Sequence, residues 1–183
     1  MNLMKKTLLI ILGILILGMS LAAFFVDRDA LIASVGIENA YAVLFVVSAT
    51  AGVSVFTAAG FFAFFGAFVG ANVDPLIASI VAGVGITFGD VIIFLFARLA
   101  RENSETIKKS KIYQRLCAFV ERLPEWGVYT FTLLYAAFIP IPNDILMVVL
   151  GVLRYKLLPI IAVMILGNIV LMYLIAQGII AVL

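Results

Sequence analysis

The chain has 183 residues, 66% of them hydrophobic, and its mean hydropathy is +1.28. So few polar residues cannot cover a protein surface in water, which excludes a soluble globular domain and predicts an all-α, polytopic membrane protein. The net charge of +2 gives no indication of nucleic-acid binding. The chain has no histidine and one cysteine, Cys117, so it lacks an intramolecular disulfide and the usual histidine-based metal or acid–base sets.

The first apolar run, residues 7–25, follows the basic pair Lys5 and Lys6. About 19 apolar residues match the thickness of a bilayer, so we predict an N-terminal transmembrane helix within residues 1–26. The alternative is a cleaved signal peptide, because small residues end the run. The basic N-terminus is expected in the cytoplasm.

Residues 41–71 form a second apolar stretch with many small and hydroxyl residues. About 30 residues are too many for one span and too few for two spans with a loop. We therefore expect a re-entrant helical hairpin broken near Gly52 to Thr57, with Ser54 and Thr57 as candidate substrate-binding residues. The alternative is a single long, tilted helix with a Gly/Ser kink.

Residues 76–97 are predicted to span the membrane, with Pro75 in the first helical turn. A carboxylate within a span is costly, which makes Asp90 a candidate functional residue. Alternatively, Asp90 lies near the end of the span and reaches interfacial water, because Arg98 follows eight residues later. Three small residues of this stretch allow close helix packing: Gly83, Gly85 and Gly89. They could pack within one protomer or between the protomers of a homo-oligomer.

Residues 98–125 are rich in charge and are predicted to be a cytoplasmic linker. Apolar residues recur there at helical spacing, which predicts an amphipathic helix on the membrane surface; they are Ile112, Leu116, Ala118, Phe119 and Leu123. Its Lys/Arg cluster either binds anionic lipid head groups or only sets the topology.

Residues 133–154 are apolar at both ends but contain Pro140, Pro142, Asn143 and Asp144 in the middle. Each proline removes a backbone donor and disfavours helix in the preceding residue. The stretch predicts a second re-entrant hairpin, with a half-helix to about Phe138 and another from about Asn143. Asp144 would lie in the first turn of the latter, where the helix dipole favours negative charge.

A basic set at 154–156 returns this hairpin to the cytoplasmic side, and residues 157–183 form the last span. Within a single domain, 27–183, two inverted repeats emerge, at about 41–97 and 126–183. Their spans share a signature, Gly89-Asp90-Val91-Ile92 and Gly167-Asn168-Ile169-Val170. Inverted repeats with paired broken helices are typical of secondary transporters, whose site lies between the breaks.

Two blocks resemble the DedA superfamily, also called the VTT or SNARE-associated Golgi family, in its short, YqaA-like branch. GITFGDVIIFLFAR resembles a Gly-Asp, aromatic, Gly-Arg block, and FIPIPNDILMVVLGVLR resembles a Phe-x-Pro hairpin block. The matching residues are Gly89, Asp90, Phe94, Arg98, Phe138, Pro140 and Gly151. The resemblance covers residue 41 to the C-terminus.

The chain departs from the family pattern in both hairpins. Where many members have an acid in the first hairpin, this chain offers only Ser54 and Thr57. Where many have arginines beside the proline of the second, it has Ala137 and either Asn143 or Asp144.

The resemblance implies a lipid or lipid-phosphate translocase, not an enzyme, in the cell membrane of a prokaryote. Its partners would be phospholipids or polyprenyl phosphates, with no cofactor beyond proton or Na⁺ coupling. Asp90 and Asp144 are the candidate coupling carboxylates, Asn143 a head-group ligand, and Arg98 a phosphate contact or a partner of Asp90. The alternatives are an exporter of small solutes or ions and a structural or assembly factor.

Overall fold

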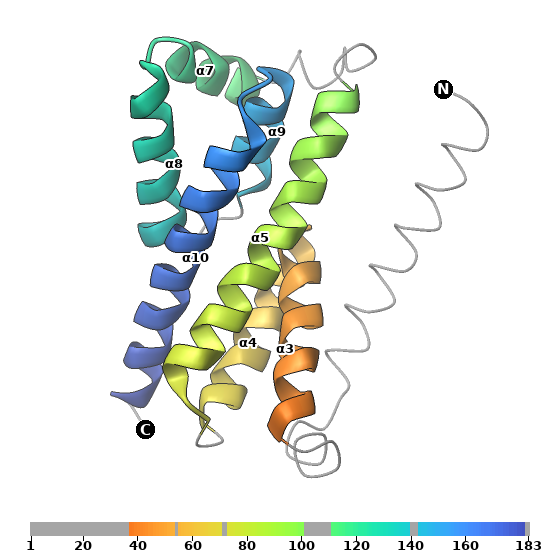
Figure 1. The fold of residues 1–183 in the computed structure, drawn as a ribbon, viewed down its shortest axis with the longest axis vertical. Helices are drawn as coiled ribbons and strands as arrows, with labels where there is room; N and C mark the ends of the chain where they lie inside the picture. The colour runs from red at the N-terminus through yellow and green to blue at the C-terminus, as the bar shows by residue number, and fades with distance from the viewer. Residues whose placement is uncertain (1–36, 54, 71–72, 101–110, 140–142, 182–183) are drawn as a thin grey trace, which may run out of the picture.

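A computed structural model describes residues 37–53, 55–70, 73–100, 111–139 and 143–181 (Figure 1). These residues form α-helices and no strand, which confirms the all-α prediction for this part of the chain. The helices are α3 (Ile37–Ala51), α4 (Val55–Gly70), α5 (Pro75–Ala100), α7 (Lys111–Val120), α8 (Glu125–Phe138), α9 (Asp144–Val152) and α10 (Leu157–Ile180). The predicted helix within 1–26 lies outside the described residues, as do Ser54, Pro140 and Pro142.

Two of these helices, α5 and α10, are long and apolar enough to cross a membrane. Their apolar stretches cover 25 and 24 residues. At 1.5 Å per residue each exceeds the roughly 30 Å hydrocarbon core of a bilayer. The two predicted spans thus coincide with continuous helices, Pro75–Ala100 and Leu157–Ile180.

The start of α5 shows why the helix begins where it does. The Asp74 carboxylate accepts hydrogen bonds from the backbone N–H groups of Leu76 (2.8 Å) and Ile77 (3.1 Å). Pro75 occupies the first helical position, where a missing backbone donor costs nothing. A side-chain cap followed by proline fixes this end of the helix.

The short helices lie in two pairs at opposite ends of the long pair: α3 and α4 at one end, α8 and α9 at the other (Figure 1). Helix α3 ends at Ala51 and α4 begins at Val55. The break predicted near Gly52 to Thr57 is thus confirmed, and the single kinked helix is wrong. Gly52 suits this turn because a Cβ there would lie 3.1 Å from the Cα of Gly89 on α5.

The second break also falls where the prolines predict it. Helix α8 ends at Phe138, and the next residue, Ile139, is extended, with φ −108° and ψ 105°. Ile139 precedes Pro140, which disfavours helical geometry in the residue before it. Helix α9 begins at Asp144, one residue after the predicted start at Asn143.

Helix α7 lies across the end of the bundle, above α8 and α9 (Figure 1). It is amphipathic, but the predicted apolar face is only partly correct. Leu116 and Leu123 are partly buried and Val120 is fully buried, whereas Ala118 and Phe119 are exposed. Two of the five predicted residues thus face away from the bundle, and the side chain of Ile112 lies outside the described residues.

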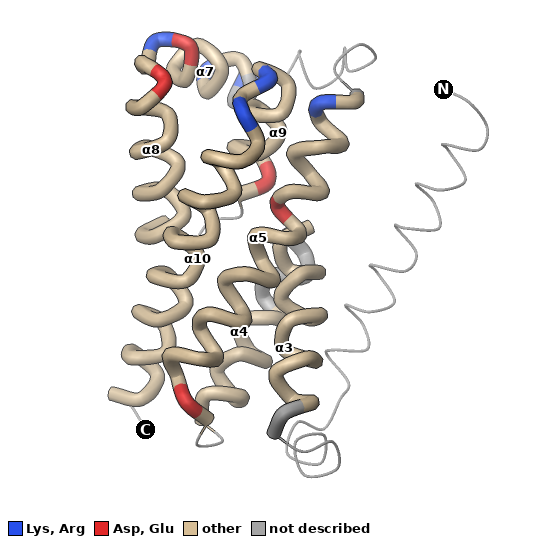
Figure 2. The backbone as a smooth tube through the Cα atoms, in the orientation of Figure 1, with Lys and Arg blue, Asp and Glu red and all other residues tan. Residues whose placement is uncertain are grey.

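All the described lysines and arginines lie at the α7 end of the bundle (Figure 2). They are Arg98, Lys111, Arg115, Arg122, Arg154 and Lys156.

The glycines of α5 pack within the protomer. A Cβ on Gly83 would lie 2.7 Å from the backbone nitrogen of Ile169 on α10. Cβ atoms on Gly85 and Gly89 would meet α3, at Ser48 and Ala49. Of the two alternatives in the sequence, packing within one chain is therefore the correct one for these three positions.

We expect Gly83→Ala to destabilise the protein by about 1–3 kcal/mol, because the new methyl group must push apart the backbones of α5 and α10. Gly178→Ala is the matched control, since nothing lies within 4 Å of a Cβ at that position. Thermal unfolding in detergent should lower the midpoint for the first variant and leave the second equal or higher, because alanine favours helix. Equal midpoints for both variants would contradict the close α5–α10 contact.

Candidate functional site

Four buried polar residues meet where α5, α10 and the start of α9 come together. They are Thr87 and Asp90 on α5, Asn143 just before α9, and Asn168 on α10. The side chain of Asp90 is buried, as is that of Asn168, with 1% exposure for each residue. We call these four residues the central cluster.

Two amide groups bind the Asp90 carboxylate. The Nδ2 of Asn143 donates to Asp90 Oδ2 (3.2 Å) and to Asn168 Oδ1 (3.3 Å). The Nδ2 of Asn168 donates to the same Asp90 oxygen (3.2 Å) and to Thr87 Oγ1 (3.0 Å). Thr87 in turn donates to the carbonyl of Gly83 (2.8 Å). Among the described residues, no lysine or arginine lies within ion-pair distance of Asp90.

Asn143 reaches the central cluster because its side chain does not cap α9. It occupies the N-cap position, and its backbone carbonyl accepts from Met147 N (2.9 Å), but its side chain makes no capping bond. The amide instead turns across to Asp90 and Asn168. The side chain of Asn143 thus links the start of α9 to both α5 and α10.

The placement of Asp90 decides between its two interpretations. The side chain is buried against neighbouring helices, which argues against the alternative of a carboxylate that reaches water. Sequence reasoning selected Asp90 and Asn143 as candidates but did not assign Asn168 or Thr87 to a site. Two signals could have found them: Thr87 lies three residues before Asp90, on the same helix face, and Asn168 follows glycine as Asp90 does.

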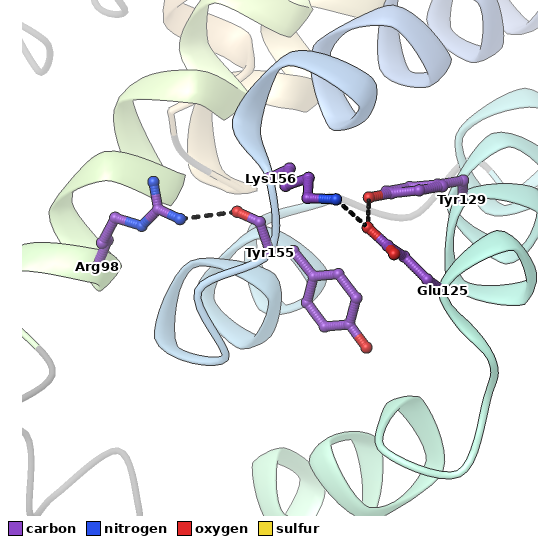
Figure 3. Close-up of polar contacts among 5 residues, drawn as sticks. All are labelled: Arg98, Glu125, Tyr129, Tyr155 and Lys156. Carbon is purple, nitrogen blue, oxygen red and sulfur yellow. Dashed lines mark hydrogen bonds and ion pairs between the residues drawn. The ribbon is translucent and has the colours of Figure 1, made fainter.

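Arg98 lies apart from the central cluster. Its Nη2 donates to the backbone carbonyl of Tyr155 (2.8 Å; Figure 3). Its guanidinium carbon lies 5.2 Å from the ring centre of Phe94. The proposed partnership with Asp90 is therefore not formed. Arg98 holds the loop between α9 and α10 against the end of α5.

The same loop is held on its other side by α8. Lys156 forms an exposed ion pair with Glu125 (3.2 Å), whose Oε1 also accepts from the Tyr129 hydroxyl (2.8 Å; Figure 3). The Tyr129 hydrogen bond, together with Lys156, keeps the pKa of Glu125 below its ordinary value. Glu125 is thus held in its charged form, as its pairing with Lys156 requires.

The other predicted residues divide between described and undescribed parts of the chain. Asp144 is the first residue of α9, partly buried, and adjoins Asn143. Thr57 lies within α4, and its side chain is not among those that the structure describes. Within the described ranges, no three His, Cys, Asp or Glu side chains are grouped as metal ligands would be.

Comparison with protein-family models, with curated proteins and with solved structures finds no match to this chain. The resemblance to the DedA superfamily therefore stays a prediction that depends on two sequence blocks.

We expect Asn168→Leu to destabilise the protein by about 1–3 kcal/mol, because Asp90 and Thr87 each lose a buried donor. The same change in an Asp90→Ala background should cost less, since the carboxylate is already gone. A double-mutant cycle from thermal unfolding should give a coupling free energy on the order of 0.5–3 kcal/mol.

The control for this cycle is Gln177→Leu, on an exposed position of the same helix, which should change stability little. Equal costs of Asn168→Leu in both backgrounds would show that the two side chains do not interact.

Proposed function

We propose that this chain is an integral membrane protein that moves lipids or lipid phosphates between leaflets, and that it consists of two inverted repeats, α3–α5 and α8–α10. The observation that best supports this is the central cluster, which lies where a broken helical pair meets two helices long enough to span. A buried carboxylate beside broken helices is the arrangement expected at a transport site.

The short helices support the re-entrant interpretation by their lengths. Helices α3, α4, α8 and α9 have 15, 16, 14 and 9 residues, fewer than the roughly 20 that cross a bilayer. In a membrane, each pair therefore enters and leaves at its own end, with its turn at depth. Unpaired backbone is tolerated there only against protein or a water-filled cavity.

Glycine contacts support the inverted repeat. In the first half, a Cβ on Gly89 would lie 2.7 Å from the Cα of Gly52, beside the end of α3. In the second half, a Cβ on Gly167 would lie 2.6 Å from the Cβ of Ala136, near the end of α8. Each glycine immediately precedes a residue of the central cluster, Asp90 or Asn168. The shared signature thus has the same packing role in both halves.

The charge distribution sets the orientation that we propose. The described basic residues lie at the α7 end (Figure 2), which by the positive-inside tendency faces the cytoplasm. The N-terminus, basic at Lys5 and Lys6, belongs on the same side. By the family resemblance, the membrane is the cell membrane of a prokaryote.

In the proposed mechanism, the central cluster latches the α8–α9 hairpin to both long helices. A phosphate head group competes for the amide donors of Asn143 and so releases the latch. Loss of those bonds leaves the Asp90 carboxylate with fewer donors. Asp144, in the first turn of α9, is the second carboxylate near the breaking point.

We expect purified protein in proteoliposomes to flip a labelled phospholipid or polyprenyl phosphate, and Asp90→Asn to slow flipping about tenfold or more, because it removes the titratable group but keeps the volume. Asp144→Asn should also slow flipping. Asp74→Asn is the matched control at the opposite end of the protein, since asparagine caps a helix as well as aspartate.

Wild-type protein that is inert towards all these lipids would refute the translocase. Uptake of labelled small solutes would favour the exporter, and full activity of both Asp90→Asn and Asp144→Asn would remove the role of the carboxylates.

Cysteine accessibility tests the second hairpin. In a Cys117→Ala background, Glu125→Cys and Lys156→Cys should react with a membrane-impermeant thiol reagent from the same side, because both lie at the α7 end. Phe138→Cys, at the end of α8, should react from neither side, since α8 stops within the bilayer. Reaction of Phe138→Cys from the opposite side would show that α8 crosses the membrane.

A further inference from the structure

A pocket of about 380 Å³ lies at the α7 end of the bundle, where the segment between α7 and α8 faces the loop between α9 and α10. It is a shallow hollow that is open to its surroundings, not an enclosed cavity. Its lining is Glu121, Glu125, Leu153, Arg154, Tyr155 and Lys156. We call it the end pocket; it shares no residue with the central cluster.

Arg154 has a backbone conformation that normally favours glycine. Its φ is 60°, in the left-handed region. It occupies the residue after the C-cap of α9 in a Schellman motif: Tyr155 N donates to Leu150 O and Arg154 N to Gly151 O, both at 3.1 Å. A side chain at this position costs about 1 kcal/mol or more relative to glycine. An arginine here is therefore unfavourable for the fold, which points to a role for its side chain.

The end pocket contains two basic and two acidic side chains, and one of each has no ion-pair partner among the described residues. Lys156 and Glu125 pair with each other at 3.2 Å. The exposed side chains of Arg154 and Glu121 have no ion-pair partner within 4 Å among the described residues. They come from two segments, the loop after α9 and the residue after α7. A ligand with only negative charge would face two carboxylates, and one with only positive charge would face two cations.

Exposed apolar side chains flank this charged region. Trp126, which follows Glu125, is 72% exposed. Leu158, two residues after Lys156, is 78% exposed. Tryptophan is enriched where the hydrocarbon meets the head groups of a bilayer. An acyl chain beside Leu158 would thus place its own head group at the level of the end pocket.

From this geometry we propose that the end pocket binds the head group of a resident phospholipid with both a phosphate and a primary ammonium group, as in phosphatidylethanolamine. The phosphate contacts Arg154, and the ammonium contacts Glu121. The inference depends on the proposed membrane placement but not on translocation, because the bound lipid need not move.

The test is binding of short-chain phosphatidylethanolamine to the full chain in detergent, compared with phosphatidylglycerol of the same chain length, which has the phosphate but no amine. We expect the ethanolamine lipid to bind about threefold to fivefold more tightly, because only its ammonium group can pair with Glu121. Equal affinity of the two lipids, or tighter binding of phosphatidylglycerol, would overturn the proposal.

Arg154→Gly is the sharpest variant, since glycine suits a φ of 60° and the fold should be as stable or more stable. It should weaken binding of phosphatidylethanolamine about threefold to fivefold. Glu121→Gln should abolish the preference for phosphatidylethanolamine over phosphatidylglycerol, and Arg115→Gln, an exposed cation of α7 outside the end pocket, should change neither.

Unchanged affinity in Arg154→Gly would refute the site. These measurements require no flipping, so an inert translocase and a failed head-group site would be told apart.

Discussion

The structure depends on one constraint: a carboxylate buried among apolar helices must find donors, and within the described part of the chain its donors are two amides. Asp90 accepts from Asn143 and Asn168, which lie 53 and 78 residues away in the sequence. Such bonds form only if the backbones approach closely. Gly83 lets α10 lie against α5, and Gly167 lets α8 lie against α10. The small residues of the long helices thus allow the close approach that the polar contacts at their crossing require.

Local rules in the sequence predict most of the helical framework. Proline chemistry locates the break after Phe138, and small residues locate the break after Ala51. The start of α5 follows from Asp74 and Pro75. These features depend on a few adjacent residues, so they can be predicted without knowledge of the tertiary packing.

The contacts of the site could be predicted only in part, because they join distant segments. Asp90 stands out as a charge within a span, but its partner Asn168 is one of several polar residues in apolar runs. The partner of Arg98 is a backbone carbonyl, which every residue has, so no pattern marks Tyr155. Likewise, the left-handed conformation of Arg154 becomes visible only once the end of α9 is known.

Helix α9 is attached to α5 at both of its ends, and this bears on how the protein can move. At one end Asn143 binds Asp90, and at the other Arg98 binds the carbonyl of Tyr155. Between them a Cβ on Gly151 would lie 3.0 Å from the Cβ of Ala97, so the two helices are tightly packed. The link from this loop to α8 is the exposed Lys156–Glu125 pair, and exposed ion pairs contribute about 0–1 kcal/mol. Because Gly167 also packs α8 closely against α10, a motion of the hairpin must open either the α5–α9 contact or the α8–α10 contact, and the exposed pair adds little resistance to the second.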